Sequence, residues 1–136
     1  MNKYHNWKGR QEQRPLPFPQ TQGQLLEITS EDSSTGLIID EIKEFVSNNG
    51  KRISSSQLRN IYGKVCSIAD NDITGIQLLR PKLAYIAARQ DNKDAKYFVE
   101  FIDGLISKIN TENHVKSFKI FMEAIVAYHK FYAKSK

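Results

Sequence analysis

Apolar side chains recur at intervals of three and four residues from Leu37 onward, and no segment alternates apolar and polar residues over the length of a strand. This periodicity is typical of amphipathic helices and predicts an all-α fold, a compact bundle of about five helices. Pro81 lies within the third helical region, where its missing amide hydrogen should restart or kink the helix. The expected helices cover residues 37–48, 54–69, 76–89, 95–109 and 111–133.

Polar residues at the helix boundaries support these assignments. Ser54 and Gln57 have the S-x-x-Q spacing of a capping box, in which each side chain binds a backbone amide at the helix start. Thr111 is placed to cap the last helix. The Asn48-Asn49-Gly50 sequence after the first helix indicates a left-handed C-cap, a conformation that glycine adopts without strain.

Residues 1–35 differ in composition from the rest of the chain. Three of the four prolines fall in Pro15-Leu16-Pro17-Phe18-Pro19, a pattern that blocks helix and favours an extended, polyproline-like chain. Four basic and four acidic side chains cancel in this region. We therefore expect a flexible, extended Pro-rich N-terminal arm over residues 1–35 and a helical-bundle domain over residues 36–136. A second interpretation is that Trp7 and Phe18 dock onto a neighbouring subunit.

The last predicted helix carries apolar residues on two sides. Such a helix either runs through the middle of a bundle or forms an interface between subunits. The alanines of the second stripe permit close approach of another helix, so we expect that stripe to pack within the same subunit. The first stripe contains Phe118, Met122, Ile125, His129 and Tyr132, and the second contains Ile120, Ala124, Ala127 and Phe131.

The charge of the chain favours an acidic partner. Its 136 residues include 20 basic and 15 acidic side chains, which gives a net charge of +5 and an isoelectric point near 9.3. Because the predicted arm is neutral, the surplus lies in residues 36–136, as expected for a protein that binds nucleic acid. A single cysteine excludes an internal disulfide. No apolar run reaches the roughly 18–20 residues of a membrane-spanning helix, and we expect a cytoplasmic protein that binds no membrane.

Three residues of the helix that begins at Pro81 form the first candidate binding surface. Lys82, Tyr85 and Arg89 are spaced i, i+3 and i+7, on the face opposite the apolar positions. Two cations can bind phosphates while the ring between them stacks on a base. The alternative is an ordinary solvated face with a partly buried tyrosine.

The second candidate surface begins at the turn after the first helix. Between Lys51 and Lys64 the chain has four cations, the other two being Arg52 and Arg59, and no acid. The turn leads directly into a helix N-terminus, where backbone amides and the helix dipole favour phosphate. This pattern indicates a second surface for a nucleic-acid backbone, although a solvated basic turn would look the same.

No arrangement of residues indicates catalysis. Cys66 and His129 could be imagined as a nucleophile and a base, but their spacing gives no support. We expect Cys66 to border the core as a small apolar residue and His129 to be a hydrogen-bonded core or interface histidine. No phosphate-binding loop, dinucleotide-binding glycine pattern, paired carboxylates or metal-ligand spacing is present. We therefore expect no enzyme activity, no cofactor and no metal.

Three stretches carry a resemblance to a known family: Ser56-Gln57-Leu58-Arg59-Asn60-Ile61-Tyr62, Leu79-Arg80-Pro81-Lys82-Leu83-Ala84-Tyr85 through Arg89, and Ile125-Val126-Ala127-Tyr128-His129-Lys130. Their order, spacing and all-helical context resemble the small subunit of type III-A CRISPR effector complexes, the second protein of the Csm set. The resemblance covers residues 37–133 and leaves out the N-terminal arm.

The resemblance implies a non-catalytic subunit of an RNA-guided ribonucleoprotein in antiviral defence. Several copies would stack head to tail, opposite the backbone subunits that hold the crRNA. They would contact the target RNA along its duplex with the crRNA, through the backbone and without reading sequence. The backbone subunits and the large subunit would perform the cleavage. Expected partners are therefore crRNA, target RNA, the other Csm subunits and further copies of this chain.

By position, the resemblance assigns the RNA contacts to particular side chains of both candidate surfaces. Lys64 and Lys130 are further candidates from the residue pattern, although Lys130 could simply solvate the last helix. The basic contacts would be Lys51, Arg52, Arg59, Lys82 and Arg89, with Gln57 and Tyr85 as polar and stacking support.

A small helix-turn-helix DNA-binding regulator is the alternative. Residues 37–48, the turn at 49–53 and the helix at 54–69 have the required order. The second helix would present mainly Arg59, Asn60 and Lys64 to a DNA groove, which is little for base readout. A small ribonuclease is a third class, for which the chain offers no catalytic pair.

Overall fold

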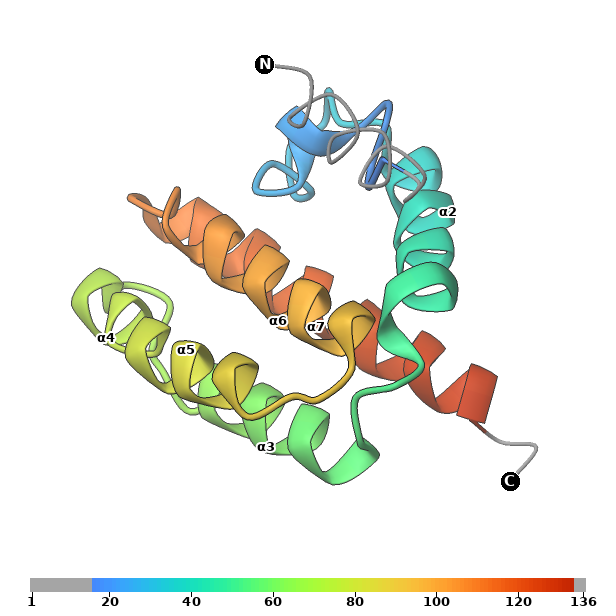
Figure 1. Cartoon of the computed structure of the whole chain (residues 1–136). Coiled ribbons are helices and arrows are strands. Elements are labelled where there is room, and N and C mark those ends of the chain that lie inside the picture. Colours follow the sequence, from blue (N-terminus) through green and yellow to red (C-terminus); the bar gives the residue numbers. More distant parts are fainter. Residues whose placement is uncertain (1–15, 134–136) are drawn as a thin grey trace, which may run out of the picture.

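The computed structural model describes residues 16–133, and the all-α prediction is confirmed. The helices follow one another in the order shown in Figure 1, and no strand occurs within the described range. The elements are the short 3₁₀-helix η1 (Gln22–Gln24), α2 (Thr35–Phe45), the π-helical turn η2 (Val46–Gly50), α3 (Ser55–Cys66), α4 (Ile73–Gln77), α5 (Arg80–Ala88), α6 (Lys93–Ile106) and α7 (Glu112–Ala133).

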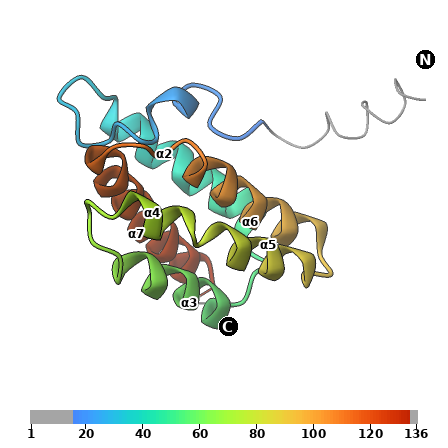
Figure 2. The same cartoon turned by 90° about the vertical axis from the view of Figure 1, so that its left-hand side faces the viewer.

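The long helix α7 organises the bundle. It packs against α2, α3 and α4, while α5 packs along α6, and η2 contacts both α6 and α7. Figures 1 and 2 show α3 and α5 side by side on the same side of the molecule. The side chains of Phe118, Met122 and Ile125 on α7 have no exposed surface, so the first predicted stripe of this helix is part of the core.

The expectation for the second stripe of α7 is wrong. Ile120 and Phe131 are 38% and 49% exposed, Ala127 is exposed and Ala124 is half-buried. The helices α2, α3 and α4 pack on α7 and cover its first stripe. Because a small domain buries only part of its chain, the second stripe stays at the surface. The second stripe therefore does not run through the interior of the subunit.

Several predicted helix boundaries are confirmed by hydrogen bonds. The Ser54 hydroxyl accepts a hydrogen bond from the Gln57 amide at 3.1 Å, and the Thr111 hydroxyl accepts one from the His114 amide at 3.0 Å. Gln57 does not close the capping box, because its side-chain oxygen accepts a hydrogen bond from Gln90 instead. Pro81 lies in the first turn of α5, separated from α4 by a break, so it restarts the helix as one alternative predicted.

The predicted left-handed cap at Gly50 is wrong. Residues 46–50 form a π-helical turn, and no glycine among residues 16–133 has a positive φ. A Cβ atom at position 50 would lie 2.8 Å from Cε1 of Phe98, a fully buried ring stacked on Phe45 at 5.1 Å. Glycine is needed there because the turn approaches this ring closely.

Gly50→Ala should therefore lower the free energy of unfolding, by about 1–3 kcal/mol, since the rigid Phe98 ring cannot move away without disturbing the core. Urea denaturation followed by circular dichroism measures the change. Gly104→Ala is the matched control, because Gly104 lies in exposed helix with no atom within 4 Å of the added methyl. Alanine there should stabilise the protein by up to about 1 kcal/mol. Equal effects at the two positions would contradict the close approach.

Residues 16–34 pack on the helical bundle, which composition did not indicate. Phe18 is 2% exposed, and its ring centroid lies 5.2 Å from those of Phe45 and Phe101 and 5.8 Å from that of Phe121. Its φ of 52° departs from the expected extended conformation. The proposed docking of Phe18 onto a neighbouring subunit is corrected, because this ring is buried in its own chain.

A buried carboxylate fixes this segment to α2. Glu41 is 7% exposed and accepts hydrogen bonds from the Thr21 amide at 3.0 Å, the Thr21 hydroxyl at 2.8 Å and the Gln20 amide at 3.2 Å. Hydrogen bonds to a charged acceptor are stronger than neutral ones. Residues 16–34 are thus held by polar and apolar contacts, whereas the rest of the predicted arm, with Trp7, lies outside the described residues.

Candidate nucleic-acid interface

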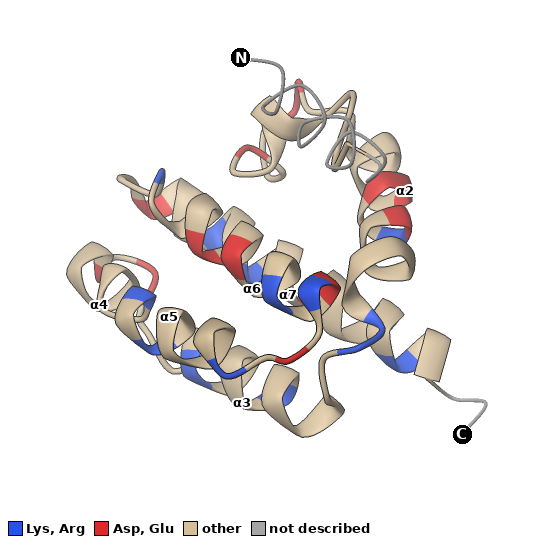
Figure 3. Ribbon diagram, in the orientation of Figure 1, with Lys and Arg blue, Asp and Glu red and all other residues tan. Residues whose placement is uncertain are grey.

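The fold places the helices that carry the two predicted basic surfaces next to each other. The side chain of Gln90, just after α5, donates a hydrogen bond to the Gln57 oxygen of α3 at 3.2 Å. This bond joins the end of α5 to the start of α3, the two helices that lie side by side in Figure 3. Basic residues mark both helices and the turn before α3 in that view.

The α5 surface presents a paired arginine and tyrosine. Tyr85 is 63% exposed, and Arg89 donates a hydrogen bond from Nη1 to its hydroxyl at 2.9 Å. The guanidinium carbon also lies 5.5 Å from the ring centroid. Lys82 is exposed on the same helix, whereas Leu83 is buried on the opposite face. A cation and an aromatic face are thus available together, as a sugar-phosphate chain with stacked bases requires.

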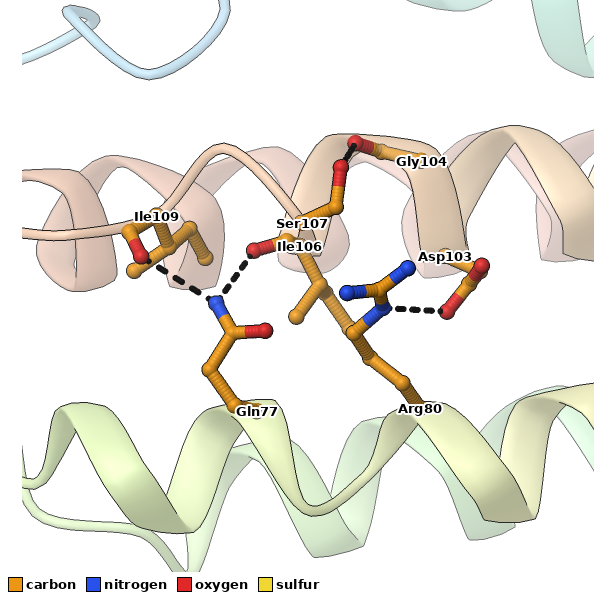
Figure 4. A network of polar contacts seen from close by, with 7 residues as sticks. All are labelled: Gln77, Arg80, Asp103, Gly104, Ile106, Ser107 and Ile109. Atoms are coloured by element: carbon orange, nitrogen blue, oxygen red, sulfur yellow. Dashed lines mark hydrogen bonds and ion pairs between the residues drawn. The ribbon is translucent and has the colours of Figure 1, made fainter.

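A network of polar contacts fixes the α4–α5 region on α6 (Figure 4). The Gln77 amide donates hydrogen bonds to the carbonyl oxygens of Ile106 at 2.7 Å and Ile109 at 3.1 Å. Arg80 Nε lies 2.9 Å from the Asp103 carboxylate. Arg80 therefore has a structural role, and it supports the helix that carries Lys82.

Three predicted contact residues of the second surface, Lys51, Arg52 and Arg59, line two hollows near the start of α3 and the end of α7, whereas Lys64 lines neither. The α3–α7 hollow, of about 160 Å³, is lined by Arg59 and Lys130, among others. The turn hollow, of about 650 Å³, is lined by Lys51 and Arg52. His129 lines both hollows, and no acidic residue lines either one.

The packing of α7 brings Lys130 and Tyr132 close to predicted contact residues from other parts of the chain. Helix packing places Lys130 in the same hollow as Arg59 of α3. Lys51 Nζ lies 5.5 Å from the ring centroid of Tyr132, a residue that the helical periodicity places on an apolar stripe. These pairs join residues far apart in the chain, so no local spacing could have revealed them. Gln57 and Lys64 are half-buried, and Gln57 is engaged with Gln90.

Some cations outside the candidate interface form ion pairs with acids. Lys119 pairs with Asp70 at 2.7 Å, and Lys116 pairs with Glu112 at 3.6 Å. Within residues 16–133, none of the predicted contact residues forms an ion pair with an acid. The arrangement leaves several positive charges for an external anion.

Cys66 and His129 lie far apart and cannot act as a nucleophile and its base. His129 is 5% exposed, and its Nε2 lies 2.9 Å from the Ile53 carbonyl oxygen, which confirms a hydrogen-bonded core histidine. Ile53 precedes the start of α3, whereas Cys66 ends that helix, about 16 Å away along its axis. Cys66 is exposed, so the expectation that it borders the core is wrong; Val65 is the buried residue of this turn.

The Cys66 side chain instead affects a neighbouring tyrosine. Its hydrogen bond with Tyr62 raises the pKa of that phenol above the ordinary value, and burial and the charge of Glu123 raise it further. The phenol therefore remains neutral at physiological pH. Among residues 16–133, no group of three or more histidine, cysteine or acidic side chains could hold a metal ion. None of the described helices is long and apolar enough to cross a membrane.

These observations define a small helical-bundle protein with a basic face. The family model described as Csm2 Type III-A matches residues 32–135. The chain belongs to this family, the small subunits of type III-A Csm effector complexes, as the resemblance predicted. No curated protein and no solved structure matches the chain.

The packing differs from that of a helix-turn-helix regulator. In that motif the two helices form a compact pair that places the second in a DNA groove. Here α2 and α3 each pack on α7, and α3 also lies beside α5. Family membership and this packing both favour the Csm small subunit over the DNA-binding alternative.

Proposed function

We propose that this chain is a non-catalytic subunit that binds the backbone of target RNA paired with crRNA, without sequence specificity, in antiviral defence. The observation that carries the proposal is the group of four cations, Lys51, Arg52, Arg59 and Lys130, around hollows without an acid. Membership in the Csm family supplies the ribonucleoprotein in which such a surface would act. Contacts to phosphates position a protein on nucleic acid but do not read its sequence.

The α5 surface would extend the same contact. Because α3 and α5 lie side by side, a sugar-phosphate chain could pass from Arg59 to Arg89. Tyr85 would offer a ring for stacking, which tolerates any base. This arrangement suits a subunit that must accept every target sequence, since the pairing of crRNA with target supplies the specificity.

Co-purification tests the proposed role. The tagged chain, expressed with its companion Csm backbone and large subunits and a crRNA, should elute in one complex that contains the crRNA. The purified chain alone should leave labelled RNA intact. A chain that stays outside the complex, or that cuts RNA by itself, would contradict the proposal.

We also propose that the exposed second stripe of α7 contacts a neighbouring copy of this chain in the complex. Support comes from the surface position of Ile120 and Ala127 and from the repeated small subunits that the resemblance implies. Alanines allow a facing helix to approach closely. An apolar stripe along a helix is a common docking surface.

Ala127→Glu should leave the isolated chain folded and prevent its assembly into the complex. The new charge would be solvated in the monomer, with a change in stability within about 0.5 kcal/mol, but it would be buried unpaired at an interface. Circular dichroism melts and co-purification measure the two effects. Asn113→Glu, an equal change of charge at an exposed position in the first turn of α7, is the control. Normal assembly of Ala127→Glu would exclude this stripe as the interface.

A further inference from the structure

His129 occupies a position that the function proposed above does not use. Its side chain is 5% exposed and lines both the α3–α7 hollow and the turn hollow. Its Nε2 lies 2.9 Å from the Ile53 carbonyl oxygen. Because a carbonyl oxygen only accepts hydrogen bonds, Nε2 carries the hydrogen and donates it. The neutral ring is therefore held in the tautomer whose Nδ1 is a bare acceptor.

The second ring nitrogen of His129, Nδ1, takes no part in the contact with Ile53. Among the described residues, no hydrogen bond reaches this atom, although every buried side-chain nitrogen and oxygen has a partner. Nδ1 is therefore not fully buried, and His129 is among the residues that line the two hollows. A neutral Nδ1 would repel an anion, whereas a protonated Nδ1 would donate a hydrogen bond to it.

The charges of the side chains around His129 favour an anionic ligand. Arg59 from α3 and Lys130 from α7 line one hollow, and Lys51 and Arg52 from the turn line the other. The remaining polar side chains there are the hydroxyls of Ser54, Ser55 and Tyr132, and no carboxylate is among the lining residues. The two hollows thus contain four cationic side chains and no anionic one. A bound phosphate offsets their charge and accepts the new hydrogen bond.

We infer that His129 binds a phosphate of the RNA backbone through protonated Nδ1, so that RNA binding takes up a proton. This inference rests on the proposed RNA-binding face and adds to it a residue that binds phosphate only when charged. Histidine changes its charge between about pH 5 and pH 8. Because the bound state favours the protonated ring, affinity for RNA should rise as the pH falls through this range.

The test uses the full-length chain and a labelled single-stranded RNA in a filter-binding assay at pH 6 and pH 8, at constant ionic strength. The wild type should bind about tenfold more tightly at pH 6, as expected for one added charge-assisted hydrogen bond. His129→Gln should remove this response, because its amide can still donate to Ile53 but cannot titrate. His114→Gln is the control; His114 lies near the start of α7, 3.3 Å from Glu27, and its replacement should leave the response unchanged.

The outcomes separate this inference from the proposed function. An unchanged pH response in His129→Gln, or RNA binding by the wild type that does not vary with pH, would overturn the role of His129 and leave the RNA-binding face standing. RNA binding unaffected by Arg59→Ala with Arg89→Ala would reject the face itself, and the role of His129 with it. If His129→Gln does not fold, nuclear magnetic resonance of the wild-type ring decides. RNA added at pH 6 should shift the His129 ring signals, and unshifted signals would reject the contact.

Discussion

Phe18→Ala should lower the free energy of unfolding by about 3–5 kcal/mol, as large-to-small substitutions of buried aromatic rings do. The ring is 2% exposed and contacts the rings of Phe45, Phe101 and Phe121, which belong to three different helices. Its loss would leave a cavity where the N-terminal segment meets the bundle. Urea denaturation followed by circular dichroism gives the change directly.

Leu16→Ala is the matched control for Phe18→Ala. Leu16 lies two residues earlier in the same segment but is 71% exposed, so its truncation should change stability by less than about 0.5 kcal/mol. If both variants were as stable as the wild type, residues 16–34 would not be part of the folded unit.

The helices and the first stripe of α7 could be predicted because their signals are local. A period of 3.6 residues places Phe118, Met122 and Ile125 on one face, and the Ser54 and Thr111 caps bind amides only three residues away. Such patterns need no knowledge of what lies across the core.

The burial of the N-terminal segment could not be predicted in the same way. Prolines around Phe18 indicate an extended chain, but the ring is held by helices that occur much later in the sequence. The burial of Glu41 could not be predicted either, since a glutamate on a helix is ordinarily exposed. Here it accepts hydrogen bonds from Thr21, and this contact appears only when the segment folds back.

Predictions from local sequence also failed where a residue far away in the sequence determines the conformation. Gly50 follows a helix, and the usual reason for glycine there is a left-handed cap. The true reason is the Phe98 ring, which lies almost fifty positions away in the sequence. The candidate interface shows the same limit, because the neighbourhood of Arg59, Lys130 and His129 depends on how α3 packs against α7.

The second prediction with a large expected effect concerns the affinity of the assembled complex for target RNA. Arg59→Ala with Arg89→Ala should weaken target-RNA capture by the assembled complex by at least about tenfold, since each charged contact contributes about 1.5–3 kcal/mol and every copy loses two. Both side chains are exposed, so stability should change by less than about 0.5 kcal/mol. Lys43→Ala with Lys108→Ala removes the same charge at exposed positions on α2 and just after α6, and it should leave capture unchanged. Equal losses in the two double variants would indicate a general effect of net charge.

The central claim, binding to the RNA backbone through this face, is tested most directly by the salt dependence of affinity. Filter binding of the purified full-length chain to two single-stranded RNAs of unrelated sequence, over a range of salt concentrations, is the measurement. The wild type should bind both RNAs weakly and with similar affinity. In Arg59→Ala with Arg89→Ala, the slope of log affinity against log salt should become shallower by about 1.4, since each lost phosphate contact reduces it by about 0.7. Strong preference for one RNA, or the same slope in the wild type and the variant, would contradict backbone recognition by these residues.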